Sequence, residues 1–191
     1  MNICRKRAFG LVGKKVDICA LDPEDTITIG GVDIADMKRE HLRKNIGIVL
    51  QEPFLFSKSF KETISDGSVH QDLESVRKYA RMAVIDDTID NFAEGYDTQI
   101  GERGVTISGG QKQRVAIARM LMQNTPIKIF DDSLSAVDME TDAKIRRAFR
   151  DEIPNTTKLI IAQRISSAAL PTMASTSKVT DFSSFFATMV A

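Results

Sequence analysis

The chain has 191 residues, with 26 basic and 26 acidic side chains and no formal net charge. This length suits one domain with a core of its own, and we predict a single domain. The balanced charge gives no indication of the strongly basic face that is typical of nucleic-acid binding, so we expect no nucleic-acid partner. No apolar run reaches the roughly 18 to 20 residues that span a bilayer, and we expect a cytoplasmic chain.

Alternating apolar residues predict two short strands near the start of the chain, at residues 26–29 and 32–34. The two glycines between them, Gly30 and Gly31, are typical of a tight hairpin turn, so the pair should be antiparallel. Residues 46–50 are apolar and predict a buried strand. Open α/β sheets bind ligands at the carboxyl ends of their strands, which makes Gln51, at the end of that strand, a candidate site residue.

Helical spacing of apolar residues predicts one helix at 72–85 and another at 111–123, which Pro126 should stop. We place both in a helical lobe covering about residues 58–123. Farther along, short β-rich runs at 127–130 and 159–162 flank a helical pattern at 139–150, as in a βαβ crossover. That topology would bring Asp132 and Gln163 to neighbouring strand ends.

A serine and two glycines precede the helix predicted at 111–123, in the run Ser108-Gly109-Gly110-Gln111. Glycines let a backbone approach an anion closely, and the start of a helix aims free N–H groups and a positive dipole end at it. The run therefore predicts a phosphate site. A second interpretation is a capping box, because serine is a good N-cap and glutamine lies three residues on. Both can hold at once.

Two aspartates, Asp131 and Asp132, follow the β-rich run at 127–130. A carboxylate at the end of a strand can reach a phosphate-bound Mg²⁺ directly or through water. The order of these motifs resembles the nucleotide-binding domain of ABC transporters. In that resemblance residues 108–111 match the signature motif, Asp131 the Walker B aspartate, and residues 135–138, ending at Asp138, the D-loop.

The resemblance implies an α/β fold: a P-loop NTPase-like (ABC ATPase) core with a partly parallel sheet, an N-terminal antiparallel hairpin and a helical lobe that carries the signature. It implies ATP and Mg²⁺ as cofactors, with Asp131 and Gln51 as metal ligands and the signature residues and Asp138 at the nucleotide. Residues 1–167 then form an incomplete domain of this type, and we expect residues 168–191 to be an atypical, poorly ordered tail.

Three departures from the family pattern predict weak or absent hydrolysis. Asp132 stands where hydrolytic members carry a glutamate and is one methylene shorter, and a displacement of roughly 1 Å can cost about a hundredfold in rate. Gln163 stands in place of the switch histidine and cannot carry a proton. The chain also has no Gly-x-x-x-x-Gly-Lys-Ser/Thr loop, and Lys14 and Lys15 are what remains of that region.

The resemblance also implies two partners. One is the transmembrane domain of an exporter, contacted through the Gln51 loop and the Glu102 region at the inner face of the membrane. The other is a second nucleotide-binding domain in a head-to-tail dimer. Alternatives are a non-catalytic module that lends its signature to a partner's ATP site, and an inert remnant. A DNA-repair or chromosome-structure ATPase is weaker, because the sequence sustains no long heptad pattern.

Overall fold

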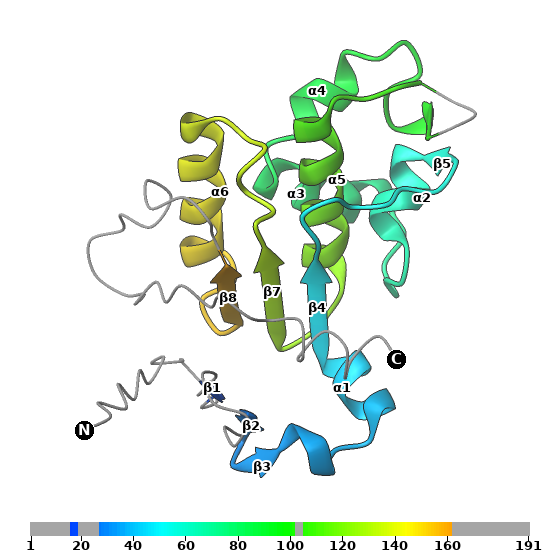
Figure 1. Ribbon diagram of the computed structural model, residues 1–191. Coiled ribbons are helices and arrows are strands. Elements are labelled where there is room, and N and C mark those ends of the chain that lie inside the picture. The colour runs from blue at the N-terminus through cyan, green and yellow to red at the C-terminus, as the bar shows by residue number, and fades with distance from the viewer. Residues whose placement is uncertain (1–15, 19–26, 102–104, 162–191) are drawn as a thin grey trace.

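The computed structural model describes residues 16–18, 27–101 and 105–161. Several predicted features lie outside these ranges: Lys14, Lys15, Glu102, Gln163 and the tail at 168–191. Within the described ranges, no helix has the length and apolar composition needed to cross a membrane. The fold is α/β, as the sequence predicts (Figure 1).

A parallel sheet in the order β4-β7-β8 forms the centre of the fold. Its strands are β4 (Ile46–Val49), β7 (Ile127–Asp131) and β8 (Thr157–Ile161). Helix α6 (Met139–Asp151) connects β7 to β8, which confirms the predicted crossover. In the register of the first pair Val49 lies beside Phe130, so the chain leaves both strands at the same edge of the sheet (Figure 1).

A separate antiparallel sheet in the order β1-β2-β3 precedes it. The strands are β1 (Val16–Ile18), β2 (Ile27–Ile29) and β3 (Val32–Asp33), followed by the short helix η1 (Ile34–Asp36). Gly30 and Gly31 have φ values of 62° and 84°, which side chains rarely adopt, and this explains the two glycines of the turn. The predicted hairpin is confirmed, whereas β1 was not predicted.

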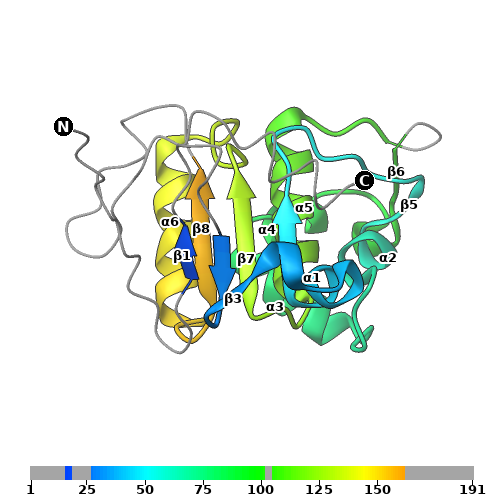
Figure 2. The same cartoon turned by 60° about the horizontal axis from the view of Figure 1, so that its bottom comes forward.

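The other helices belong to the first half of the chain and to the lobe, and of these α1 and α5 contact β4. They are α1 (Arg39–Asn45), α2 (Phe60–Ser65), α3 (Leu73–Met82), α4 (Asp86–Asp90), η2 (Gly95–Asp97) and α5 (Gly109–Met122), with a small sheet of β5 (Lys58–Ser59) and β6 (Gln99–Ile100). Figure 2 shows α5 and α6 behind the parallel strands, with α1 in front.

The helix predicted at 72–85 is wrong at its C-terminal end, because α3 ends at Met82. Val84 has a φ of 55°, and the N–H of Ile85 reaches back to the carbonyl of Ala80 at 2.9 Å. This is the hydrogen bonding of a Schellman motif, in which the left-handed residue is usually glycine. A β-branched residue gives no sequence signal for such an end.

The two faces of β7 pack against different layers. Phe130 is fully buried with residues of α5 and α6, and its ring lies 4.7 Å from that of Phe149. Ile127 and Ile129 pack on the opposite face with Ile34 and Leu42. The strand is therefore buried on both sides, as strands of parallel sheets are.

Lys128 interrupts this apolar strand and is itself buried. Its ammonium donates to the carbonyls of Met120 at 3.0 Å and Gln123 at 2.7 Å, which are unpaired groups at the C-terminal end of α5. Burial lowers the pKa of Lys128 to about 8. Its neighbour in register, Lys158, does the same for the end of α6 through the carbonyls of Phe149 and Ile153.

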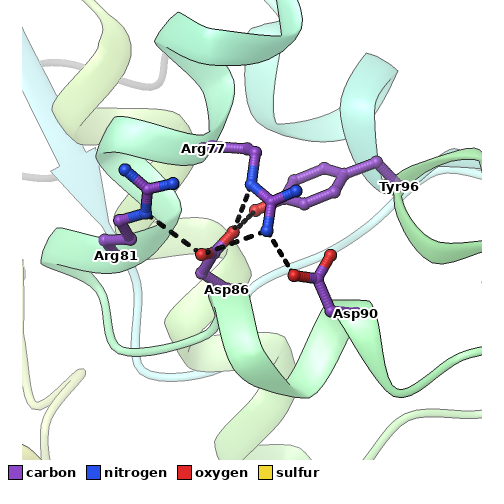
Figure 3. Close-up of polar contacts among 5 residues, drawn as sticks. All are labelled: Arg77, Arg81, Asp86, Asp90 and Tyr96. Carbon is purple, nitrogen blue, oxygen red and sulfur yellow. Dashed lines mark hydrogen bonds and ion pairs between the residues drawn. The ribbon is translucent and has the colours of Figure 1, made fainter.

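A charged cluster joins α3, α4 and η2 (Figure 3). The Asp86 carboxylate accepts from the Tyr96 hydroxyl at 2.6 Å and from Arg81 at 3.1 Å, and Arg77 bridges it to Asp90. Burial alone would raise the pKa of Asp86, but the hydroxyl and the two guanidinium groups outweigh burial and lower it. The cluster joins η2 to α3 and α4.

Asp86→Asn should lower the free energy of unfolding by about 2 kcal/mol at pH 7, less than for a fully buried pair because the arginines reach solvent. The lowered pKa of Asp86 means that the stabilisation is fully present above the unfolded pKa near 4 and is lost progressively as the pH falls through the lower folded pKa. Urea unfolding at pH 7 and pH 3 measures both effects. Asp87→Asn, on an exposed neighbour, is the control. Equal losses at the two pH values would contradict the electrostatic explanation.

Candidate functional site

The carboxyl ends of β4 and β7 bring together two residues that the sequence predicts as site residues. The side-chain amide of Gln51 donates to the Asp132 carboxylate, with 3.4 Å between Nε2 and Oδ2. These residues are 81 positions apart in the chain. The parallel register of the two strands makes their contact possible, because each residue follows its strand by one or two positions.

The two adjacent aspartates differ in surroundings. Asp132 is 7% exposed and has a φ of 44°, a left-handed conformation that aspartate tolerates better than most residues. The Ser135 hydroxyl donates to the Asp132 carbonyl at 2.7 Å and closes the turn that holds this conformation. Burial, and then the negative charge of Asp132, raise the pKa of Asp131. A cation between the carboxylates would relieve this unfavourable pairing of charges.

These oxygens fit Mg²⁺ in their chemistry. Carboxylate and amide oxygens are the donors that hard cations prefer, and Mg²⁺ typically takes one or two carboxylates together with phosphate oxygens and water. In the part of the chain that the structure describes, no three His, Cys, Asp or Glu side chains gather as a complete metal cage. The Asp131 and Asp132 pair therefore suits a metal that arrives with a phosphate ligand.

The start of α5 confirms the capping interpretation. The Ser108 hydroxyl accepts from the N–H of Gln111 at 3.2 Å, and the Gln111 side chain accepts from the N–H of Ser108 at 2.7 Å. Among the described residues, a Cβ at Gly109 would meet no atom within 4 Å, so the space beside this glycine is open. A Cβ at Gly110 would lie 2.9 Å from the carbonyl of Ala136. The glycine at this position therefore allows α5 to pack against the turn that contains Ala136.

Asp138 caps a helix as well. Its carboxylate accepts from the backbone N–H and the hydroxyl of Thr141, at 2.9 and 2.7 Å, and so begins α6. Hydrogen bonds to the backbone and side chain of Thr141 lower the pKa of Asp138. Both carboxylate oxygens therefore have partners within the chain, and a contact with nucleotide would compete with the cap.

Gln113 is a buried polar residue that the sequence did not predict as part of the site, and the structure places it against the segment that contains Gln51. Its side chain is 2% exposed, and its amide donates to the carbonyls of Leu50 and Gln51. The available signal was a polar residue two positions before Val115, inside the buried part of α5. Position along a helix does not reveal which loop such a side chain meets.

An aromatic pair follows Gln51 and lies largely in solvent. Phe54 and Phe56 are 64% and 57% exposed, and their rings pack edge to face with centroids 5.1 Å apart. Leu50, next to Gln51, is also half exposed. Two exposed phenylalanines in one short segment indicate a surface for a partner more than a solvated loop.

Comparisons with known proteins show the family of the chain. Residues 18–135 match the family model described as ABC transporter. The chain is 47% identical over 141 residues to the uncharacterized ABC transporter ATP-binding protein YknU of Bacillus subtilis, covering 74% of this chain and 24% of that protein. It is 41% identical over 140 residues to the putative multidrug export ATP-binding/permease protein YgaD of the same organism, covering 73% of this chain and 24% of that protein.

A solved structure of a bacterial Atm1-family ABC exporter with ATP bound has the same fold. The two chains superpose with a TM-score of 0.71 at 41% identity, over 77% of this chain and 26% of that one. The chain thus spans about a quarter of the length of these relatives.

Removal of the Asp132 charge should change the titration of its neighbour. In Asp132→Ala, we expect the pKa of Asp131 to fall while staying above its usual value, because burial, the larger cause, remains. Carboxyl ¹³C chemical shifts measured against pH report this pKa directly. Asp87→Ala should leave it unchanged. An Asp131 pKa that does not move in Asp132→Ala would mean that the two carboxylates do not interact.

Proposed function

Because the chain belongs to the ABC transporter family, we propose that it binds ATP with Mg²⁺ as the nucleotide-binding part of an exporter. The observation that carries this proposal is the contact between Gln51 and Asp132. This contact connects the carboxyl ends of two parallel strands, next to Asp131. Nucleotides bind at such strand ends in α/β proteins. The exporter structure with ATP bound, at 41% identity, supports the same function.

In this proposal the start of α5 binds a phosphate group. The free N–H groups of the first helical turn and the helix dipole favour an anion, and Gly109 leaves the approach open. The phosphate belongs to a nucleotide held mainly by a second nucleotide-binding domain, arranged head to tail. Ser108 then serves both as the cap of α5 and as a hydroxyl ligand.

Asp131 and the Gln51 side chain hold Mg²⁺ through oxygen atoms. When bound, the ion neutralises phosphate charge and helps to orient the nucleotide. The Gln51 amide has one oxygen and one NH₂ group. Because its NH₂ already donates to Asp132, its oxygen is left for the metal or for water.

The reaction of the family is ATP + H₂O → ADP + phosphate. Asp132 orients the attacking water and accepts its proton, and the contact with Gln51 restricts the rotation of the carboxylate. Its short side chain should make turnover slow, since misplacement by roughly 1 Å can cost about a hundredfold in rate. Gln163 can donate a hydrogen bond to phosphate but cannot relay a proton.

The membrane-spanning partner contacts the surface formed by Leu50, Phe54 and Phe56, in the segment that follows β4. Relatives such as YgaD are named as ATP-binding/permease proteins. A partner of this kind would hold the chain at the inner face of the membrane, and the Glu102 region is a second contact. Apolar rings in a short segment next to Gln51 can transmit its movement to that partner.

Equilibrium binding of a fluorescent ATP analogue with Mg²⁺, in competition with unlabelled ATP, tests the proposed function. We expect saturation below about 100 μM, equivalent to roughly 5.5 kcal/mol. Asp131→Asn should weaken binding with Mg²⁺ but not binding measured in EDTA, because only the metal contact is lost. Asp87→Asn should change neither. Absence of saturation up to about 1 mM, or roughly 4 kcal/mol, would refute ATP binding by this chain.

A second candidate function is a non-catalytic module that completes the ATP site of an intact partner domain. The intact capping box of α5 favours it, together with a sequence that has no Gly-x-x-x-x-Gly-Lys-Ser/Thr loop. Such a module needs only its signature end, because the partner supplies the phosphate loop. The module need not bind ATP on its own.

Ser108→Arg tests this shared site. The arginine would fill the open approach to α5, so ATP hydrolysis by an intact partner domain should fall at least about tenfold in the mixture, roughly 1.4 kcal/mol. Arg147→Ser, a change to an exposed residue of α6, should have no effect. If the mixture hydrolyses ATP equally with wild type and Ser108→Arg, the signature does not serve the partner's site.

A further inference from the structure

Gln113 is a buried residue of α5 whose side-chain amide contacts the segment that follows β4. Its Nε2 donates to the carbonyl of Gln51 and lies 3.4 Å from the carbonyl of Leu50. Gln113 itself is 2% exposed. Within the described residues, its Oε1 is buried without a partner. The two carbonyls therefore determine how the amide is oriented.

The two carbonyls belong to residues outside the sheet. Strand β4 ends at Val49, so Leu50 and Gln51 lie beyond the ladder that pairs β4 with β7. The donor to their carbonyls comes from a helix, and Gln113 lies 62 positions after Gln51 in the chain. The Gln51 backbone is thus tied directly to α5.

The same helix carries the signature residues at its start. Gln113 lies in the second turn of α5, and the first turn is fixed to it by the bond from the Lys112 N–H to the Ser108 carbonyl at 2.9 Å. A helix moves as a rigid body over so short a distance. When the Gln51 carbonyl shifts and Gln113 moves with it, the N–H groups at the start of α5 therefore move as well.

The unpaired Oε1 is the second observation. A buried acceptor without a donor is unfavourable, because it has lost its hydrogen bonds to water. A backbone N–H presented by a rearranged segment at 50–52 would remove this cost. The side chain can therefore hold the Gln51 segment in more than one arrangement, because an amide has both donor and acceptor atoms.

We propose that Gln113 is a positioning residue that couples the Gln51 segment to the signature end of α5. Gln51 contacts the nucleotide bound by its own domain, whereas Ser108 serves the nucleotide of the partner domain. Gln113 thus connects one ATP site to the other within a single chain. This inference rests on the proposed function, since it requires that Gln51 responds to nucleotide.

Gln113→Met tests the coupling, because methionine matches the length of glutamine and has no N–H donor. Gln123→Met is the matched control. Gln123 is also a glutamine of this helix region whose amide meets a backbone carbonyl, that of Asp66 at 3.5 Å, but it lies at the far end of α5. If Gln113→Met does not fold by circular dichroism, Gln113→Glu keeps the shape and, when ionised, also has no donor.

Amide hydrogen exchange with and without ATP and Mg²⁺ is the readout, in peptides covering residues 50–56 and 106–111. The chain is kept monomeric, as checked by size-exclusion chromatography, so that the signature touches no nucleotide directly. In wild type and Gln123→Met, we expect ATP to slow exchange about fivefold in both peptides. In Gln113→Met, we expect slowing at 50–56 to remain and slowing at 106–111 to disappear.

The outcomes separate the inference from the proposed function. Slowing at 106–111 that persists in Gln113→Met, or that is equally lost in Gln123→Met, overturns the coupling and leaves ATP binding intact. No ATP-dependent change in any peptide of the wild-type chain refutes the proposed function, and the coupling falls with it. A purely structural contribution of Gln113 would raise exchange at 50–56 without changing the ATP response at 106–111.

Discussion

The parallel pairing of β7 with β4 on one side and β8 on the other is the constraint on which the structure depends. It buries Phe130 under α5 and α6 and brings the carboxyl ends of three strands to one edge. Asp131 and Asp132 lie at that edge because they end the central strand. A shift in register by one residue would exchange the two faces of β7 and place Lys128 on the opposite side.

Helix α5 is tied to its surroundings by side chains that bind backbone carbonyls. Gln113 binds the carbonyls after β4, Arg114 binds the carbonyl of Val84 at the end of α3, and Lys128 binds the last carbonyls of α5 itself. Each contact satisfies a carbonyl that regular secondary structure leaves unpaired. Apolar packing holds the helix on the sheet, whereas these directional contacts fix its position along the helix axis, which matters for a ligand at its start.

Local patterns predicted much of the fold, and the failures have physical causes. The hairpin at Gly30 and Gly31, the crossover through α6 and the capping box at Ser108 were predicted, because each depends on residues a few positions apart. The end of α3 was not, because Val84 takes a conformation that costs a β-branched residue about 1 to 2 kcal/mol and that tertiary packing must support. The burial of Lys128 was not predicted either, because its side chain binds carbonyls at the end of α5 that only tertiary packing brings to it.

The sequence by itself determined which residues are candidates for the site: the signature run at the start of α5, the two aspartates at the end of β7 and the glutamine after β4. Short-range rules suffice for these, since each follows from its neighbours in the chain. Only the tertiary structure decided that Gln51 contacts Asp132, 81 positions away in the chain. It also decided that Gln113, on α5, donates to the backbone carbonyl of Gln51. These contacts depend on strand order and register, which are set by long-range burial and leave no signal in any single segment.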